Sequence, residues 1–272
     1  MDQGFKWLFR SVLSAVLFSL VVSFPALAKA ETVKVAVASN FKTTAEALVR
    51  AYSLKSGHEV VLSSGSTGKL YTQIKNGAPF EVFLAADSLR AALSEKNGLA
   101  VAGSRFTYAR GRIALWSNRA DLAGLGPDYL KGDKVTRLAI ANPKTAPYGQ
   151  AAVEMLKNLR LYEAVKHKIV QGENIAQTYQ FVYSGNAEVG VVALSQIVSQ
   201  ALQQQKTVAT QNSEIGGVSW VVPEHLYQPI DQQAVLLIKG QGNPAATAFV
   251  AYLKSDEAAA IIQSFGYATV KP

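Results

Sequence analysis

The chain has 272 residues, of which 49% are hydrophobic, and a formal net charge of +8 at pH 7. It contains no cysteine, which excludes a disulfide scaffold, thiolate metal sites and a cysteine nucleophile. Its 27 lysine and arginine residues are scattered, without the basic runs and interleaved aromatic residues of nucleic-acid-binding grooves. We therefore expect no nucleic-acid partner. The net positive charge should help to steer a small anion toward the protein.

The first 30 residues have the pattern of a secretory signal peptide. Lys6 and Arg10 precede an apolar stretch at 11–24, and Ala28-Lys29-Ala30 fits a small-x-small cleavage site. The apolar stretch is shorter than the roughly 20 residues that span a bilayer. The pattern predicts export to the periplasm with cleavage after Ala30.

Strand-like and helical segments alternate in the part of the chain that follows. Strands are predicted at 33–38, 59–63 and 82–86. Helices are predicted after them, at 41–56, 70–76 and 88–96. This alternation predicts an α/β fold in which a parallel sheet has helices on both faces.

Two long strands flank a middle α/β block. The first is predicted at 107–118, with Gly111 inside it, and the second at 228–239. Between them the pattern predicts a strand at 136–141, a helix at 149–161, a helix from Ile175 and a strand at 188–193. After the second long strand, the tail at 249–267 is predicted to be helical. The chain should therefore cross between two lobes and return. Lobe I would comprise 31–110 plus 232–272 and lobe II would comprise 111–231, after the signal peptide at 1–30.

Two loops of the first lobe place hydroxyl and backbone N–H groups at the start of a predicted helix. Ser39-Asn40 follows the strand at 33–38, and Gly65-Ser66-Thr67-Gly68 follows the strand at 59–63. The unpaired N–H groups and the dipole of a helix start favour an anion. The second loop lacks the GxxxxGK[ST] spacing of ATP-binding loops. Read alone, both loops are equally compatible with ordinary helix caps.

Two loops of the second lobe have a similar form. Tyr148 follows the strand at 136–141, where its hydroxyl either donates to an anion or only lines a cleft wall. Asn174 precedes the helix from Ile175 and can cap it, which would leave the N–H groups of Ile175 and Ala176 free. Ligands of open α/β sheets bind where strands end in such loops, so a cleft between the lobes is the predicted site.

Sequence patterns of catalysis are weak. His58, His167 and His225 lie in unrelated contexts, and His167 falls in an apparent helix. The sequence has no G-x-S-x-G elbow, no HExxH pair and no carboxylate cluster suited to a metal. Asp87 follows a strand, where it is either a helix-start residue or a buried base. We expect neither an enzyme nor a cofactor.

Several segments, in this order and spacing, resemble the periplasmic molybdate-binding proteins of bacterial ABC importers. The resemblance covers nearly the whole chain after residue 30, and it is the order of the motifs that is specific. The segments are VAVASNF, GSTGKLYTQIKNGAPFEVFLAAD, LAIANPKTAPYGQAA, AEVGVVALSQI and FVAYLKSDEAAAIIQSFGY.

This resemblance implies the two-lobe periplasmic binding protein fold of type II, with a mostly parallel sheet flanked by helices in each lobe and two crossing strands. It implies that one molybdate or tungstate ion binds between the lobes through neutral hydroxyl and N–H donors, without direct protein–metal ligands. The loaded protein, by default a monomer, would then dock on a membrane permease. Carried over by position, the ligand contacts fall on Ser39, Asn40, Ser66, Thr67, Tyr148 and Ile175.

One position departs from the pattern of many family members. They have a tyrosine contact at the position of Ala193 and a small residue at the position of Tyr148, whereas this chain has the tyrosine at 148, like a subset of the family. The phenol therefore reaches the predicted pocket from the other side.

Other functions remain open on the sequence alone. A receptor for sulfate, phosphate or chelated iron would share the scaffold, and an iron site would pair Tyr148 with a second tyrosine such as Tyr179 or Tyr183. An enzyme on the same scaffold is a further alternative. The sensing domain of a transcription regulator is disfavoured, because a signal peptide and no DNA-binding segment precede Val33.

Overall fold

In the computed structural model, which describes residues 30–208 and 217–268, ten strands form two five-stranded sheets. From Glu31 onward, the described residues cluster as one compact unit. The predicted signal peptide lies outside the described residues, except for Ala30. Within them, no helix has the length and apolar character needed to cross a membrane. We call the part built on the first sheet lobe I and the part built on the second sheet lobe II.

The sheet of lobe I has its buried, apolar strands at the centre. β1 pairs in parallel with both β2 and β3, and β10 runs antiparallel to β3 and β4. The order is β2 (Glu59–Gly65), β1 (Thr32–Ala38), β3 (Val82–Ala85), β10 (Ile230–Leu236) and β4 (Phe106–Gly111). All but one of these strands therefore run in one direction.

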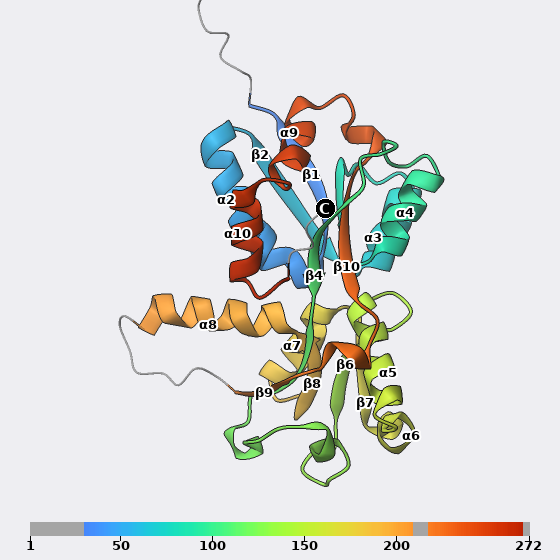
Figure 1. The fold of residues 1–272 in the computed structure, drawn as a ribbon, viewed down its shortest axis with the longest axis vertical. Helices are drawn as coiled ribbons and strands as arrows, with labels where there is room; N and C mark the ends of the chain where they lie inside the picture. The colour runs from blue at the N-terminus through green and yellow to red at the C-terminus, as the bar shows by residue number, and fades with distance from the viewer. Residues whose placement is uncertain (1–29, 209–216, 269–272) are drawn as a thin grey trace, which may run out of the picture. The chain divides into compact units, whose positions relative to one another are not determined.

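Helices cover both faces of this sheet (Figure 1). One face packs on α2 (Lys42–Ser56), α9 (Pro244–Tyr252) and α10 (Asp256–Ser264) through a core that includes Phe41, Leu48 and Phe249. The other face packs on α3 (Thr67–Lys75) and α4 (Ser88–Lys96). The predicted alternation of strands and helices is confirmed for this lobe.

Lobe II repeats the same plan. β6 pairs in parallel with β7 and β8, and β5 runs antiparallel to β8 and β9. The order is β7 (Ile169–Gly172), β6 (Leu138–Ala141), β8 (Val189–Ala193), β5 (Ile113–Ser117) and β9 (Val218–Val221). Its helices are α5 (Pro147–Asn158), α6 (Tyr162–Val165), α7 (Ile175–Tyr183) and α8 (Leu194–Val208). The core cluster of α5 also includes Ile175 at the start of α7, whereas Val182 near the end of α7 belongs to a second cluster.

The chain passes between the lobes twice. β4 ends in the first sheet at Gly111 and β5 begins in the second sheet at Ile113, so only Arg112 separates them. The chain returns from β9 through η5 (Glu224–Leu226) to β10. The predicted two-lobe architecture with two crossings is confirmed (Figure 1).

One detail of the predicted elements is wrong. The single strand predicted at 107–118 is two strands, because the chain changes sheets at Gly111 and Arg112. The helix predicted around His167 is a short 3-10 helix there, η4 (Lys166–Lys168), between α6 and β7. The remaining 3-10 helices are η1 (Ser39–Phe41), η2 (Ala120–Leu122), η3 (Pro127–Leu130) and η6 (Ile238–Gly240).

Candidate functional site

A small cavity lies between the lobes, at the ends of strands from both sheets. Its lining combines residues that follow β1, β2 and β3 in lobe I with residues at the starts of α5 and α7 in lobe II. None of the side chains that line it is charged. The cavity brings together all the residues predicted as ligand contacts, which are Ser39, Asn40, Ser66, Thr67, Tyr148 and Ile175.

The first loop lies at the end of the central strand β1. Its two residues, Ser39 and Asn40, begin η1, so their N–H groups lie in the first turn, where helical N–H groups have no partner within the helix. The carboxamide of Asn40 is turned elsewhere: Nδ2 donates to Gln232 Oε1 at 2.9 Å and to Tyr267 Oη at 3.0 Å. Asn40 therefore offers the cavity its main chain, while its side chain secures the loop.

The second loop supplies a hydroxyl group without a protein partner. Ser66 precedes α3 in extended conformation, its side chain makes no cap bond, and the residue is 3% exposed. Its Oγ is buried and has no hydrogen-bond partner among the described residues. Burial of a hydroxyl group without a partner costs free energy, because the group loses its hydrogen bonds to water and gains none in the protein. A ligand is therefore expected at this position.

Thr67 behaves differently from its neighbour Ser66. Its Oγ1 accepts a hydrogen bond of 3.1 Å from the N–H of Ala86, in the loop after β3. This bond ties the second loop to the end of the third strand. The hydroxyl proton of Thr67 stays available, because the oxygen acts as the acceptor in that bond.

Tyr148 is held at the second position of α5 by its neighbours in sequence. Pro147 occupies the first helical position, where its fixed φ suits a helix start. A Cβ on Gly149 would lie 2.1 Å from the carbonyl oxygen of Ala141, the last residue of β6. The helix start can therefore approach the strand end this closely only because residue 149 is glycine.

The start of α7 has a capped and an uncapped part. Asn174 Oδ1 accepts a hydrogen bond of 3.0 Å from the N–H of Gln177, whose Oε1 accepts a bond of 2.6 Å from the N–H of Glu173. This pattern resembles a capping box. It satisfies the third N–H group of the helix and leaves those of Ile175 and Ala176 unused by the cap, as the sequence predicts.

A buried hydrogen-bonded network lies against the cavity, and the sequence does not predict it. Tyr148 Oη accepts from Gln232 Nε2 at 3.1 Å and from Asn40 Nδ2 at 3.3 Å. Tyr267 Oη donates to the carbonyl oxygen of Asn40 at 2.9 Å. Tyr108 Oη lies 3.2 Å from Gln232 Oε1 and from the carbonyl oxygen of Ala85. Gln232 carries one sequence signal, since it falls in phase with the buried Ile230 and Ala234 of β10.

The phenols of this network stay protonated over a wide pH range. Burial raises the pKa of Tyr108 and of Tyr148 well above 10.0, and it raises the pKa of Tyr267 to about 12. The site therefore presents neutral hydrogen-bond donors, which stabilise an anion through oriented dipoles rather than through an opposite charge.

We expect the free energy of unfolding to fall steeply above pH 10. Tyr108, Tyr148 and Tyr267 lose their protons near pH 10.0 in the unfolded chain but keep them when folded. The unfolded state then binds fewer protons, so stability is full below pH 10 and is lost as pH rises toward the folded pKa values. Urea unfolding at about pH 8, 10 and 11 measures this loss, and Tyr108→Phe should make the decline shallower. Equal stability at all these pH values would contradict the expectation.

Direct polar contacts join the lobes beside the cavity. Lys69 Nζ lies 2.7 Å from Glu173 Oε2, and the N–H of Gly68 donates to the carbonyl oxygen of Thr145 at 2.9 Å. A Cβ on Gly68 would lie 3.0 Å from that same oxygen. The start of α3 therefore touches the loop before α5 directly.

Residues considered for other chemistry do not line the small cavity. Asp87 caps α4 by accepting from the N–H of Arg90 at 2.7 Å, and it also pairs with the Arg90 guanidinium. Tyr179 and Tyr183 stack on each other and line a larger groove of about 400 Å³, not the small cavity. In the described residues, no group of three His, Cys, Asp or Glu side chains is arranged to hold a metal ion.

Comparisons with known proteins agree over nearly the whole described chain. Residues 33–268 match the family model described as bacterial extracellular solute-binding protein. The molybdate-binding protein ModA of Azotobacter vinelandii is 48% identical over 88% of this chain and 91% of its own. ModA of Rhodobacter capsulatus is 43% identical over 94% of this chain and 95% of its own. The solved structure of the Azotobacter vinelandii periplasmic molybdate-binding protein superposes with a TM-score of 0.80 and 37% identity, over 88% of this chain and 100% of that one.

Proposed function

Because the chain belongs to the family of bacterial extracellular solute-binding proteins, we propose that it binds molybdate in the cavity between its lobes and delivers it to the membrane permease of an ABC importer. Tungstate, an oxyanion of the same shape and charge, is the second expected ligand. The protein acts in the periplasm after removal of residues 1–30, as a monomer without catalytic activity. Its lobes comprise 31–110 plus 232–272 and 111–231, and they close on the ion.

The observation that carries the proposal is the buried, unpartnered hydroxyl of Ser66 in a cavity lined by uncharged groups of both lobes. The N–H groups at the starts of η1, α3 and α7 and the hydroxyl groups of Ser66, Thr67 and Tyr148 are the proposed donors. An ion that accepts hydrogen bonds at four tetrahedral oxygens matches such a set. Because donors come from both lobes, lobe closure is part of recognition.

The same donors account for selection among oxyanions. Hydrogen phosphate carries a proton at neutral pH that needs an acceptor, and no carboxylate lines the cavity. Sulfate has no proton, but its shorter bonds leave some donors out of reach, and each unmade buried hydrogen bond costs about 1–3 kcal/mol. A cavity that selects by size therefore prefers molybdate and tungstate.

Calorimetric titration of residues 31–272 with molybdate, tungstate, sulfate and phosphate, in separate runs, tests the proposal. The expected result is tight one-to-one binding of molybdate and tungstate, with much weaker or undetectable binding of the other two. Equal affinity for sulfate would contradict selection by size. A failure to bind any of the four ions would contradict the oxyanion site itself.

Replacing Ser66 by alanine is expected to weaken molybdate binding about ten- to a hundredfold, because it removes a donor to a charged ligand worth about 1.5–3 kcal/mol. The free energy of unfolding of the ligand-free protein should not fall, since the hydroxyl has no protein partner. Titration calorimetry and urea unfolding measure the two effects. Ser255→Ala is the contrasting variant, because Ser255 caps α10 away from the cavity: it should lower stability and leave affinity unchanged. Loss of stability in Ser66→Ala would contradict an unpartnered hydroxyl.

A further inference from the structure

We infer that Gln232 is a positioning residue that directs the one proton of the Tyr148 hydroxyl toward the bound anion. This inference rests on the proposed function. Gln232 lies on β10, one of the strands at the crossing between lobes, and it is 0% exposed. Gln232 is not among the residues that line the cavity, so it acts through Tyr148.

The hydrogen-bond partners of the Tyr148 hydroxyl group leave its proton unused by the protein. A phenol has one proton to donate and an oxygen that accepts. Among the described residues, the Tyr148 oxygen has nitrogen donors as its only hydrogen-bond partners, Gln232 Nε2 at 3.1 Å and Asn40 Nδ2 at 3.3 Å. Neither of these amide nitrogens accepts a hydrogen bond. The proton of Tyr148 therefore has no protein acceptor and is left for a ligand in the cavity that Tyr148 lines.

The orientation of the Gln232 carboxamide is set on its opposite side. Its Oε1 lies 2.9 Å from Asn40 Nδ2, a donor, and 3.2 Å from Tyr108 Oη. Turning the carboxamide over would place Nε2 against the nitrogen of Asn40 and lose that bond. The carbonyl oxygen of Gln232 is thus bonded within lobe I, and its NH2 group donates to Tyr148 of lobe II.

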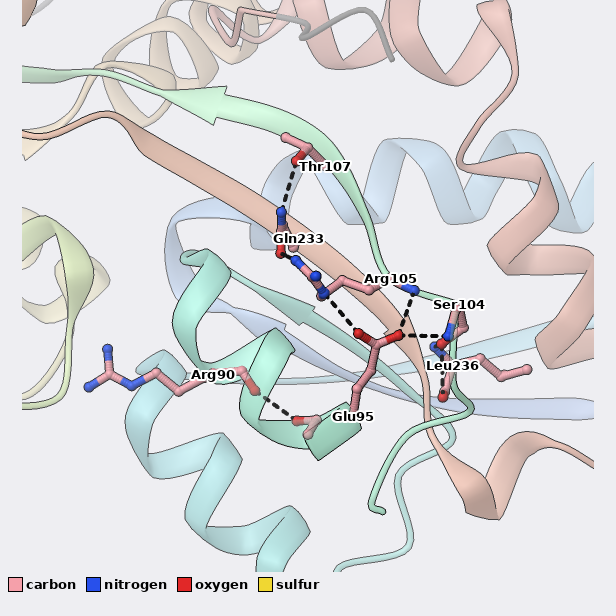
Figure 2. Close-up of polar contacts among 9 residues, drawn as sticks. Arg90, Glu95, Ser104, Arg105, Thr107, Gln233 and Leu236 are labelled. Atoms are coloured by element: carbon pink, nitrogen blue, oxygen red, sulfur yellow. Dashed lines mark hydrogen bonds and ion pairs between the residues drawn. The ribbon is translucent and has the colours of Figure 1, made fainter. Parts of the chain in front are cut away.

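An irregularity in β10 separates Gln232 from its neighbour Gln233. The pairing of β10 with β4 shifts register between these two residues. Gln233 accepts from Arg105 Nη1 at 2.9 Å and donates to Thr107 Oγ1 at 3.0 Å, next to the ion pair of Arg105 with Glu95 (Figure 2). Adjacent glutamines of one strand therefore have separate networks, of which only that of Gln232 reaches Tyr148.

This arrangement provides a matched pair of variants. Gln232→Met keeps the approximate volume of the side chain but removes the donor to Tyr148, whereas Gln233→Met removes a comparable set of hydrogen bonds away from the cavity. Both are compared with the unsubstituted protein by molybdate titration and by urea unfolding without ligand. We expect Gln232→Met to weaken molybdate binding about tenfold and Gln233→Met to change it less than about twofold.

The same pair is then measured in a Tyr148→Phe background. Because Gln232 acts through the hydroxyl of Tyr148, adding Gln232→Met to Tyr148→Phe should cause no further loss of affinity. A tenfold loss that persists in this background would overturn the inference in favour of a general structural role. Unchanged or tighter binding by Gln232→Met alone would also overturn it, since Gln232 would then not be directing the proton to the anion.

Failure of the inference can be distinguished from failure of the proposed function. If the unsubstituted protein does not bind molybdate, the proposed function fails, whereas normal binding with an unaffected Gln232→Met variant contradicts only the inference. If Gln232→Met does not fold, Gln232→Leu also removes the donating nitrogen and adds no other hydrogen-bond donor. It should weaken molybdate binding about tenfold, by the same loss of a donor, and unchanged affinity would overturn the inference.

Discussion

Alanine at position 111 is expected to weaken molybdate binding by about a hundredfold or more, while the protein still folds. A Cβ at Gly111 would lie 2.1 Å from Tyr148 Oη and 2.9 Å from Gln232 Nε2. Both atoms lie at the far ends of side chains, so the phenol can move aside while the backbone keeps its position. Moving aside takes the Tyr148 hydroxyl from the cavity and breaks its bond to Gln232, so the ligand loses a donor and the network is disrupted.

Titration of Gly111→Ala with molybdate measures this effect. Gly242→Ala is the matched control, because a Cβ at Gly242 meets no atom within 4 Å and should leave affinity unchanged. Circular dichroism of both variants checks that the fold is retained. Normal affinity in Gly111→Ala would show that the position of the Tyr148 hydroxyl is not needed for binding.

Alanine at position 149 is expected to lower the free energy of unfolding by about 3–5 kcal/mol. Its Cβ would lie 2.1 Å from the carbonyl oxygen of Ala141, 2.6 Å from the carbonyl carbon of Ala141 and 2.9 Å from that of Asn142. These are backbone atoms, so relief requires α5 to shift away from the end of β6, and the core beneath that helix opens.

Urea unfolding of Gly149→Ala, compared with Gly242→Ala, measures the loss. Since α5 also carries Tyr148, molybdate affinity should fall as well, and saturating ligand should recover less stability than in the unsubstituted protein. A stability within about 1 kcal/mol of the unsubstituted protein would show that α5 accommodates the extra methyl group.

The sequence predicted the parts of the site that depend on local patterns. Ser66 and Ile175 lie at helix starts because a strand, a polar loop and an amphipathic run follow one another in the chain. The parallel order of the strands then brings such loops to one edge of each sheet. The family resemblance inferred from the order of the motifs is confirmed by the matching family model and the identity to the ModA proteins.

The sequence did not predict the network behind the site. Asn40 bonds to Gln232, which follows it by 192 residues in the sequence, and to Tyr267, which follows it by 227 residues. Such pairs leave no local periodicity, and their geometry depends on how β10 shifts register beside Gln232. For the same reason the sequence did not show that the side chain of Asn40, a predicted contact residue, bonds to Gln232 and Tyr267.

The break of the long strand at Arg112 was also missed, although the predicted lobe boundary falls between residues 110 and 111. Residues 107–118 have uniform strand character, and strand propensity does not show which sheet a residue joins. At this break, a Cβ on Gly111 would lie 2.1 Å from Tyr148 Oη and 2.9 Å from Gln232 Nε2, so tertiary neighbours crowd the position. One glycine within a strand pattern was the only local sign of it.

The hydrogen bond from Tyr267 to the main chain of Asn40 has a consequence for biosynthesis. A ribosome makes the chain from its N-terminus, so Asn40 emerges long before Gln232 and Tyr267 are translated. Until those last partners arrive, the first loop lacks the contacts that secure it and the anion pocket is unfinished. A nascent or truncated chain that ends before Tyr267 therefore should not trap molybdate, and the ability to bind arises only after Tyr267 has been made.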